Sequence, residues 1–212
     1  MGLVLIVLLV LALDFCQEES EIDQSVSFKD SHSYSYSMGE MANLDSREDD
    51  EGSSYSWYAG FSWFGTLAVT VDKFDVYQKN DIDGSGLFEE EMFASDLSDW
   101  SDSMVLIVAT LDVKNIDAQP SVDDHSFLAS VFSMSGSISY VPTFVDFGNA
   151  ALKNATEKDF YRFYIAPGEE ERIRIGWLVE EEHLSHDAQF FVGATGTEKY
   201  TFTIQLKDRE EG

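Results

Sequence analysis

Alternating apolar and polar positions run through the chain after Gly65 and predict β-strands. In the segment 66–77 (TLAVTVDKFDVY) the alternation continues up to Val71, shifts by one residue near Asp72-Lys73, and resumes at Phe74. A one-residue shift of this kind predicts a β-bulge. The residues assigned to the apolar face are Leu67, Val69, Val71, Phe74 and Val76.

Three more long segments carry strand signals. Segment 104–115 (MVLIVATLDVKN) is apolar on both faces, as in a central strand that is covered on each side. Segments 171–180 and 199–208 also alternate; the residues expected to point inward are Ile173, Ile175, Trp177, Val179, Tyr200, Phe202, Ile204 and Leu206. Shorter candidate strands are Phe127–Phe132, Ser137–Phe144, Phe160–Ile165 and Gln189–Val192, and Pro167-Gly168 marks a turn. About seven or eight short strands with almost no helical periodicity predict an all-β fold, an antiparallel β-sandwich over residues 57–208, followed by a short tail, 209–212.

The amino-terminal residues 1–16 are predicted to be a signal or anchor segment. Gly2–Leu13 is apolar without interruption and, as a helix, would rise about 18 Å, well short of the roughly 30 Å hydrocarbon core of a bilayer. This length is more typical of a signal peptide than of a spanning helix. Cys16 follows, and Leu13-Asp14-Phe15-Cys16 resembles a bacterial lipobox in its leucine and cysteine but not in the residues between them. A lipid anchor on Cys16, a signal anchor and a cleaved signal with an incidental cysteine all remain open. Either anchor predicts contact with a membrane through the amino terminus, and a cleaved signal predicts secretion.

Residues 17–56 are rich in Ser, Asp and Glu and hold few aliphatic residues. Such a segment buries too little apolar surface to offset the entropy of ordering, so it is predicted to be a disordered acidic linker. It would be either a spacer that holds the domain away from a membrane or a solvated tail without a function.

Charge and motif content limit the functions that are open. The net charge is −27, from 13 Lys and Arg against 40 Asp and Glu, which argues against binding to nucleic acid. Cys16 is the only cysteine, so no disulfide can form within the chain. The sequence contains no G-x-S-x-G elbow, no H-E-x-x-H run and no phosphate-binding glycine motif, so the protein is predicted not to be an enzyme.

Several of these segments together resemble a known group of proteins. The strand TLAVTVDKFDVY, the phrase IVATLDVKN, the turn and strand IAPGEEERIRIGWLV and the terminal YTFTIQL are similar to immunoglobulin-like domains of unknown function in bacterial lipoproteins and secreted antigens. The resemblance covers roughly Gly65 to Asp208, and Pro167-Gly168-Glu169 is its most specific element. It implies an immunoglobulin-like sandwich on the extracytoplasmic side, either anchored to the cell membrane or secreted, and it implies no catalytic residues.

One acidic segment begins like a calcium-binding loop. In NDIDGSGLFEEEM, Asp81, Asp83 and Ser85 occupy positions 1, 3 and 5 of an EF-hand loop, and Gly86 occupies the position of its turn. Position 12 is Met92 rather than a carboxylate, so a weak site would need Glu89 or Glu91 in addition. The alternative, which the sequence favours, is an acidic turn between the first two long strands.

Two other clusters are candidate sites. YSWYAGFSWFG (55–65) concentrates aromatic residues. Tyr55, Trp57, Tyr58 and Trp63 would form a binding surface for a sugar or protein, an edge strand packed on the sandwich, or a staple between linker and domain, and a structural role is favoured. In HLSHD (183–187) two histidines are three residues apart, but a solvated loop is favoured over a metal site because no helix is predicted there.

The sequence therefore predicts a membrane-tethered, extracytoplasmic interaction module with no catalytic activity, whose partner is an unknown protein or glycan. The alternative is a calcium-responsive binding module that uses the Asp81–Glu91 loop.

Overall fold

The computed structural model describes residues 34–46, 63–84, 87, 93–120, 125–139, 141–153, 160–184, 188–193 and 200–203. All of them belong to one compact unit, His32–Gly212. Within these ranges the regular structure consists of β-strands and short 3₁₀-helices, without an α-helix. None of the described residues forms a helix that is long and apolar enough to cross a membrane.

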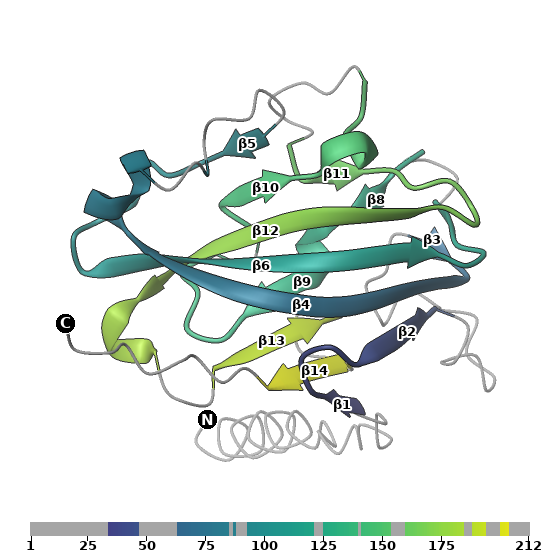
Figure 1. The fold of residues 1–212 in the computed structure, drawn as a ribbon, viewed down its shortest axis with the longest axis horizontal. Helices are drawn as coiled ribbons and strands as arrows, with labels where there is room; N and C mark the ends of the chain where they lie inside the picture. Colours follow the sequence, from purple (N-terminus) through teal and green to yellow (C-terminus); the bar gives the residue numbers. More distant parts are fainter. Residues whose placement is uncertain are drawn as a thin grey trace, which may run out of the picture. The chain divides into compact units, whose positions relative to one another are not determined.

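The described strands form two main sheets and two short ribbons (Figure 1). The six-stranded sheet has the order β2 (Met41–Asp45), β4 (Thr66–Gln78), β6 (Met104–Asn115), β12 (Glu170–Glu180), β10 (Phe144–Asp146) and β5 (Phe93–Ser95). The four-stranded sheet has the order β1 (Tyr34–Tyr36), β14 (Tyr200–Thr203), β13 (Gln189–Val192) and β9 (Phe132–Met134). The ribbons pair β11 (Arg162–Phe163) with β8 (Phe127–Leu128) and β3 (Trp63–Phe64) with β7 (Gln119–Pro120). The 3₁₀-helices are η2 (Lys79–Gly84), η3 (Ala129–Val131), η4 (Gly148–Ala150) and η6 (Glu181–His183).

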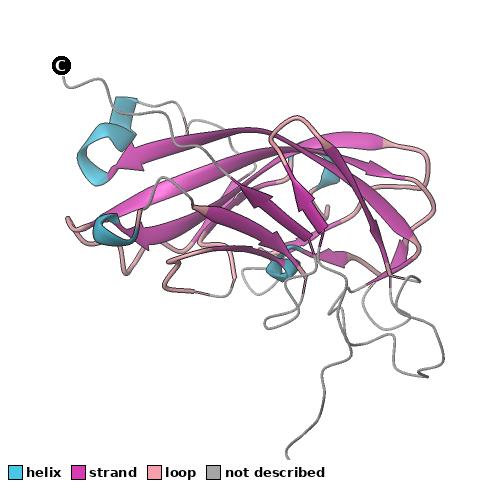
Figure 2. Cartoon of the chain, turned by 90° about the horizontal axis from the view of Figure 1, so that it is seen from below, coloured by secondary structure: helices cyan, strands magenta, loops and turns pink. Residues whose placement is uncertain are grey.

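The two main sheets face each other as the layers of a sandwich (Figure 2). Phe190 of β13 lies 5.6 Å from Trp177 of β12 and 5.9 Å from Phe74 of β4, measured between ring centroids, so aromatic rings join the layers. The alternation predicts inward residues on β4 up to its bulge and on β12 along 173–179, and these residues are buried in this core. The predicted all-β sandwich is thus confirmed, with its core where the alternation indicates.

The long strands follow their sequence signals closely. β6 spans the predicted segment 104–115 and is hydrogen-bonded on both sides, to β4 and to β12. The pairing of β4 with β6 shifts between Val71 and Lys73, which confirms the predicted bulge. Beyond the bulge Phe74 is only partly buried and Val76 is exposed, so this end of β4 leaves the core.

The prediction of a disordered linker over 17–56 is wrong for residues 34–46. These residues, which we call the N-terminal arm, contain β1 and β2 and add one strand to each sheet. The prediction of a purely antiparallel sandwich is also wrong, because β1 runs parallel to β14. Composition fails here because an edge strand needs few inward residues: Ala42 and Leu44 are the two buried apolar residues of β2.

Two short predicted strands are also corrected. Within Phe127–Phe132 the chain forms β8 and then η3, with β9 beginning only at Phe132. Among the described residues of Ser137–Phe144, only an isolated bridge at Ser137 and the first residue of β10 pair as strand. The Ser137 hydroxyl donates to the Ser139 carbonyl at 2.7 Å, and such local bonds of serine compete with a strand ladder.

Part of the outer face of the six-stranded sheet is covered by the connection between β4 and β6. A second apolar cluster forms there, in which Leu87 and Trp100 of the connection pack with Leu106 and Val108 of β6. The Trp100 indole N–H donates to the Met104 carbonyl at 3.1 Å. This cover explains why β6 is apolar on both faces.

Candidate functional surface

A network of backbone and side-chain hydrogen bonds holds one end of the sandwich, where β4 begins and β6 ends. The Thr66 amide donates to Asp117 Oδ1 at 2.9 Å, and the Ile116 amide donates to the Thr66 carbonyl at 3.1 Å. Gly65 has φ +100°, and a Cβ built there would lie 2.7 Å from the Asp117 carbonyl oxygen. Only glycine fits this close approach without a shift of the backbone.

Asn115 ties a second chain segment to the same end. Its side-chain amide donates to the carbonyls of Ala118 (3.0 Å) and Ile165 (2.8 Å), and its Oδ1 accepts from the Ala118 amide at 2.7 Å. The Asn115 carbonyl also accepts from the Gly168 amide at 2.7 Å, in the predicted Pro167-Gly168 turn. Asn115 is fully buried, so these bonds offset the desolvation of its amide group and fix the turn after β6.

Two large apolar side chains are exposed on this braced end. Phe64 is 52% exposed and Ile116 is 47% exposed, and they directly precede Gly65 and Asp117, the two residues in close contact. Trp63, next to Phe64, points the other way, is 2% exposed and meets the ring of Phe127 edge-on at 5.8 Å between centroids. Phe64 is therefore held in place by a buried neighbour and a rigid backbone. We call Phe64 and Ile116 the apolar tip.

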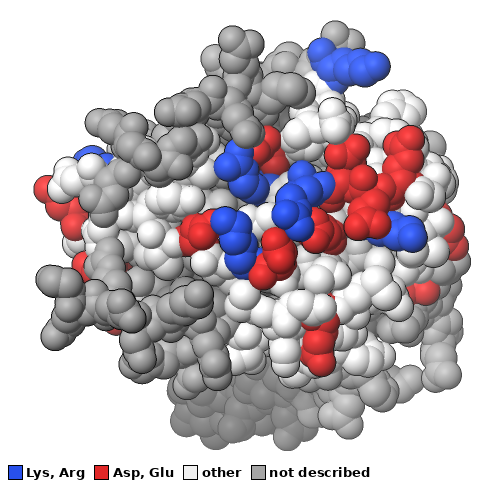
Figure 3. Space-filling view, viewed as in Figure 1, with Lys and Arg blue, Asp and Glu red and all other residues white. Residues whose placement is uncertain are grey.

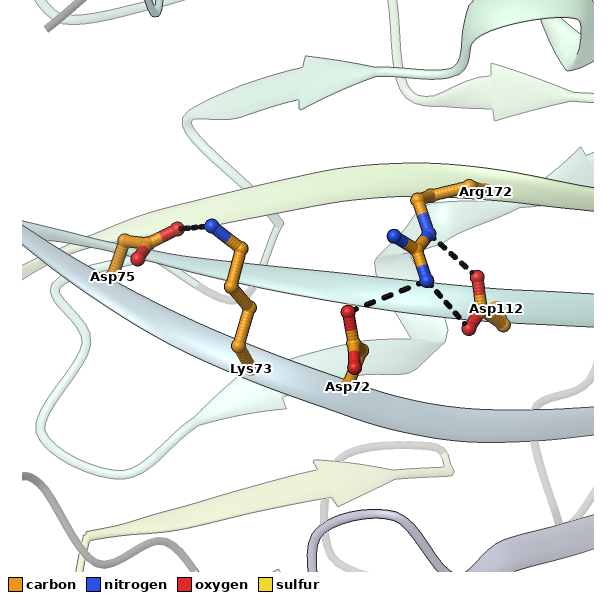
Figure 4. A network of polar contacts seen from close by, with 5 residues as sticks. All are labelled: Asp72, Lys73, Asp75, Asp112 and Arg172. Atoms are coloured by element: carbon orange, nitrogen blue, oxygen red, sulfur yellow. Dashed lines mark hydrogen bonds and ion pairs between the residues drawn. The ribbon is translucent and has the colours of Figure 1, made fainter.

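The open part of the outer face of the six-stranded sheet is charged instead (Figure 3). Arg172 of β12 bridges two strands: its Nε donates to Asp112 Oδ1 at 2.7 Å, and its Nη2 lies 3.3 Å from Asp72 Oδ2 (Figure 4). The hydrogen bond from Arg172 lowers the pKa of the Asp112 carboxyl below its usual value. Beside it, Lys73 Nζ lies 2.7 Å from Asp75 Oδ2, and this contact raises the pKa of the Lys73 ammonium.

A further pair continues this charged face towards β10. Arg174 Nε donates to Asp146 Oδ2 at 2.7 Å, while Asp146 Oδ1 accepts from the Gly148 amide at 3.0 Å. The acidic and basic groups of the face thus engage one another. Such a face suits exposure to solvent. Each basic side chain drawn in Figure 4 is already paired with a carboxylate, so none of them is left to bind an anion.

The predicted calcium loop is only partly described. The backbone of Asp81 and Asp83 forms η2 at the end of β4, whereas Ser85, Glu89 and Glu91 lie outside the described residues. No three His, Cys, Asp or Glu side chains among the described residues are grouped so that they could hold a metal ion. The calcium site therefore remains a prediction from the sequence.

The predicted aromatic surface divides in two. Trp63 is buried against Phe127, so its indole belongs to the core and not to a surface, which corrects the prediction for this residue. Tyr55, Trp57 and Tyr58 lie outside the described residues, as does Cys16. Phe64 was part of the same aromatic run, and its exposure follows from its place one residue after a buried Trp63 in a short strand.

Of the two histidines in HLSHD, His183 is exposed at the end of η6 and His186 lies outside the described residues. Ile116 and Asp117 were not singled out by the sequence. Their only signal was a position directly after the long strand 104–115, where an apolar residue and an aspartate enter a turn.

Comparison with known protein families identifies one match. A family model described as a domain of unknown function, DUF5027, matches residues 68–206, and the chain therefore belongs to this family. Comparisons with curated proteins and with solved structures found no match.

Proposed function

We propose that this member of the DUF5027 family is a non-catalytic interaction module, and that the apolar tip formed by Phe64 and Ile116 is its contact surface for a protein or glycan. The single observation that carries the proposal is the exposure of these two side chains on a braced backbone. Exposed apolar side chains on a rigid support lose little entropy on binding, and aromatic residues are frequent anchors of interfaces.

The wider setting of the module is part of the same proposal. We infer an immunoglobulin-like type of sandwich on the extracytoplasmic side, either tethered to the cell membrane through residues 1–16, with lipid on Cys16 as one form of the tether, or secreted. The support for this is the apolar run Gly2–Leu13, the position of Cys16 after it and the resemblance of residues 65–208 to domains of bacterial lipoproteins. Mass analysis of the mature protein tests the tether: a diacylglyceryl adduct on Cys16 is the expected result, and an unmodified Cys16 in a membrane-free fraction contradicts it.

Photo-crosslinking tests the apolar tip. A benzophenone amino acid is placed at Phe64 or at Ile116 in the full chain, in the cells that produce it, and at the exposed Asp99 near the opposite end of β6 as a control. We expect one discrete adduct of the same mass from both tip positions and none from position 99. Equal adducts from all three positions, or none from the tip, contradict the proposal.

A binding measurement follows with the captured protein or, if the adduct contains a glycan, with an array of defined glycans. Phe64→Ser is expected to weaken binding by about tenfold or more, as typical for an aromatic anchor at an interface. Because Phe64 is half exposed, the melting temperature should change little, which separates lost binding from lost folding.

Calcium binding by the Asp81–Glu91 loop is the alternative from the sequence. Titration calorimetry of the full chain with calcium chloride tests it. Heat of binding and a higher melting temperature at millimolar calcium support the alternative, and the absence of both removes it.

A further inference from the structure

The N-terminal arm completes both sheets of the sandwich at once. β1 lies beside β14, where Tyr34 and Tyr36 stack on Tyr200 at 5.5 and 6.4 Å between ring centroids. β2 lies beside β4. The turn between β1 and β2 is bound to the bulge of β4, because the Gly39 amide donates to the Val71 carbonyl at 2.9 Å. Without the arm, β4 and β14 would each present an unpaired strand edge.

The arm is held by strand pairing and by a small set of side chains. Ala42 and Leu44 are fully buried in the main core, and Tyr36 packs against it in part. The other residues of this core lie later in the chain. The family match begins at residue 68, inside β4, so the arm lies outside the region that the family model matches.

The length of the connection to the rest of the domain sets how far the arm can reach. Residues 47–62 join Ser46 to β3, and sixteen extended residues span at most about 55 Å. In one chain the Ser46 amide donates to the Gly65 carbonyl at 3.1 Å, so the connection is a loop whose ends are held together. Closing such a loop costs entropy that an arm paired with a different copy does not have to spend.

The arm also exposes apolar surface. Tyr34, Met38 and Met41 are among the exposed large hydrophobic residues, and Met41 is 58% exposed. Exposed apolar side chains on an edge strand favour association with a further chain.

We propose that the N-terminal arm is exchangeable: the edges of β4 and β14 in one copy accept residues 34–46 of a second copy, which gives a strand-exchanged dimer. The contacts of the arm are the same in the monomer and in the dimer, so their relative populations depend on concentration and on the loop 47–62. A connection of this length gives an effective concentration on the order of a millimolar, so dimer is expected as a minor species at about 100 µM and as a larger one at higher protein concentration. This inference does not depend on the apolar tip.

A disulfide between the arm and its acceptor strand tests the proposal in the full chain. Met41 and Thr70 are directly opposed on β2 and β4, at a separation that suits a disulfide. Met41→Cys and Thr70→Cys are combined with Cys16→Ser, the protein is equilibrated at several concentrations, oxidised, and separated on a non-reducing gel. An arm paired within its own chain gives a cross-linked monomer, and an exchanged arm gives a covalent dimer.

The matched control places the same chemistry where no exchange is proposed. Lys114→Cys and Glu170→Cys, also with Cys16→Ser, oppose two exposed residues on β6 and β12, and their disulfide stays within one chain in either form. We expect covalent dimer only from the arm pair, with a dimer-to-monomer ratio that rises about tenfold for a tenfold rise in concentration while dimer is scarce.

Cross-linked monomer at every concentration, or dimer no more abundant than in the control, overturns the proposal. Absence of any disulfide from the arm pair overturns it as well, because β2 would then not pair with β4. Adding Leu44→Asp to the arm pair should abolish both cross-linked forms, since a charged residue does not enter the core position of Leu44.

Discussion

The two halves of the outer face of the six-stranded sheet differ sharply, although the same strands form both. At the beginning of β6, Leu106 and Val108 point outward and are buried under the connection that holds Leu87 and Trp100. Towards the end of β6 the outward position is Asp112, which pairs with Arg172 in the open. The comparison teaches that an outward position on a strand is apolar or charged according to what covers it, and not according to the strand itself.

The transition between the halves occurs at Thr110. Its side chain is buried between the apolar cluster and the charged network, and its Oγ1 has no hydrogen-bond partner among the residues that the structure describes. The inner face of β6 shows no such change, because the four-stranded sheet and the short ribbons cover it along its length. Three predictions test this division.

Leu106→Ala should give the largest effect. The substitution removes a fully buried side chain from the covered half and leaves a cavity, which typically costs about 2–5 kcal/mol in the free energy of unfolding. Urea denaturation followed by tryptophan fluorescence measures it. A loss below about 1 kcal/mol would mean that the connection does not cover this half in solution.

Gly176→Ala should have an intermediate effect. A Cβ at this position of β12 would lie 3.2 Å from Leu106 Cδ1, Phe144 Cβ and the Ile107 carbonyl oxygen. Because this space is already filled, overpacking should destabilise the fold by about 1–3 kcal/mol. A stabilised Gly176→Ala variant would show that the covered half is loosely packed; Gly168→Ala is no suitable control, since φ is +86° there.

Asp112→Asn should give the smallest effect, and one that depends on pH. Arg172 lowers the pKa of Asp112 in the folded state, so the stabilisation is fully present above the unfolded pKa of about 3.9 and is lost as the pH falls through the lower folded value. The variant should therefore be slightly less stable than the natural chain at pH 7 and equal to it in strong acid. Melting temperatures measured between pH 2 and 7, roughly, and again in high salt check this, since salt screens an exposed pair. A difference that persists in strong acid would assign the effect to packing instead.

Much of the fold could be predicted from the sequence because the burial pattern of each long strand is visible in its own residues. The alternation in β12, the two-sided apolar run of β6 and the phase shift in β4 each report the burial of successive side chains. The N-terminal arm could not be predicted in this way. Its two buried residues, Ala42 and Leu44, acquire their environment only from β4, and Tyr36 acquires its own from β14.

The candidate surface was even less accessible to sequence reasoning. The aromatic run 55–65 indicated a region but not which ring is exposed, and Trp63 proved to be buried while Phe64 is not. Ile116 and Asp117 enter the surface through contacts with Gly65 and Thr66, about fifty residues earlier in the chain. Such contacts leave no local pattern.

The sequence by itself determined the all-β class, the position of the long strands and the inward face of each. The reason is that successive strand residues point to opposite faces, so the alternation of apolar and polar residues reports burial directly. The tertiary structure decided which edge is covered by the arm, which half of the outer face is apolar, and that Phe64 and Ile116 share one braced end. These features depend on segments far apart in the chain, and the free energy that selects them exists only once the segments meet.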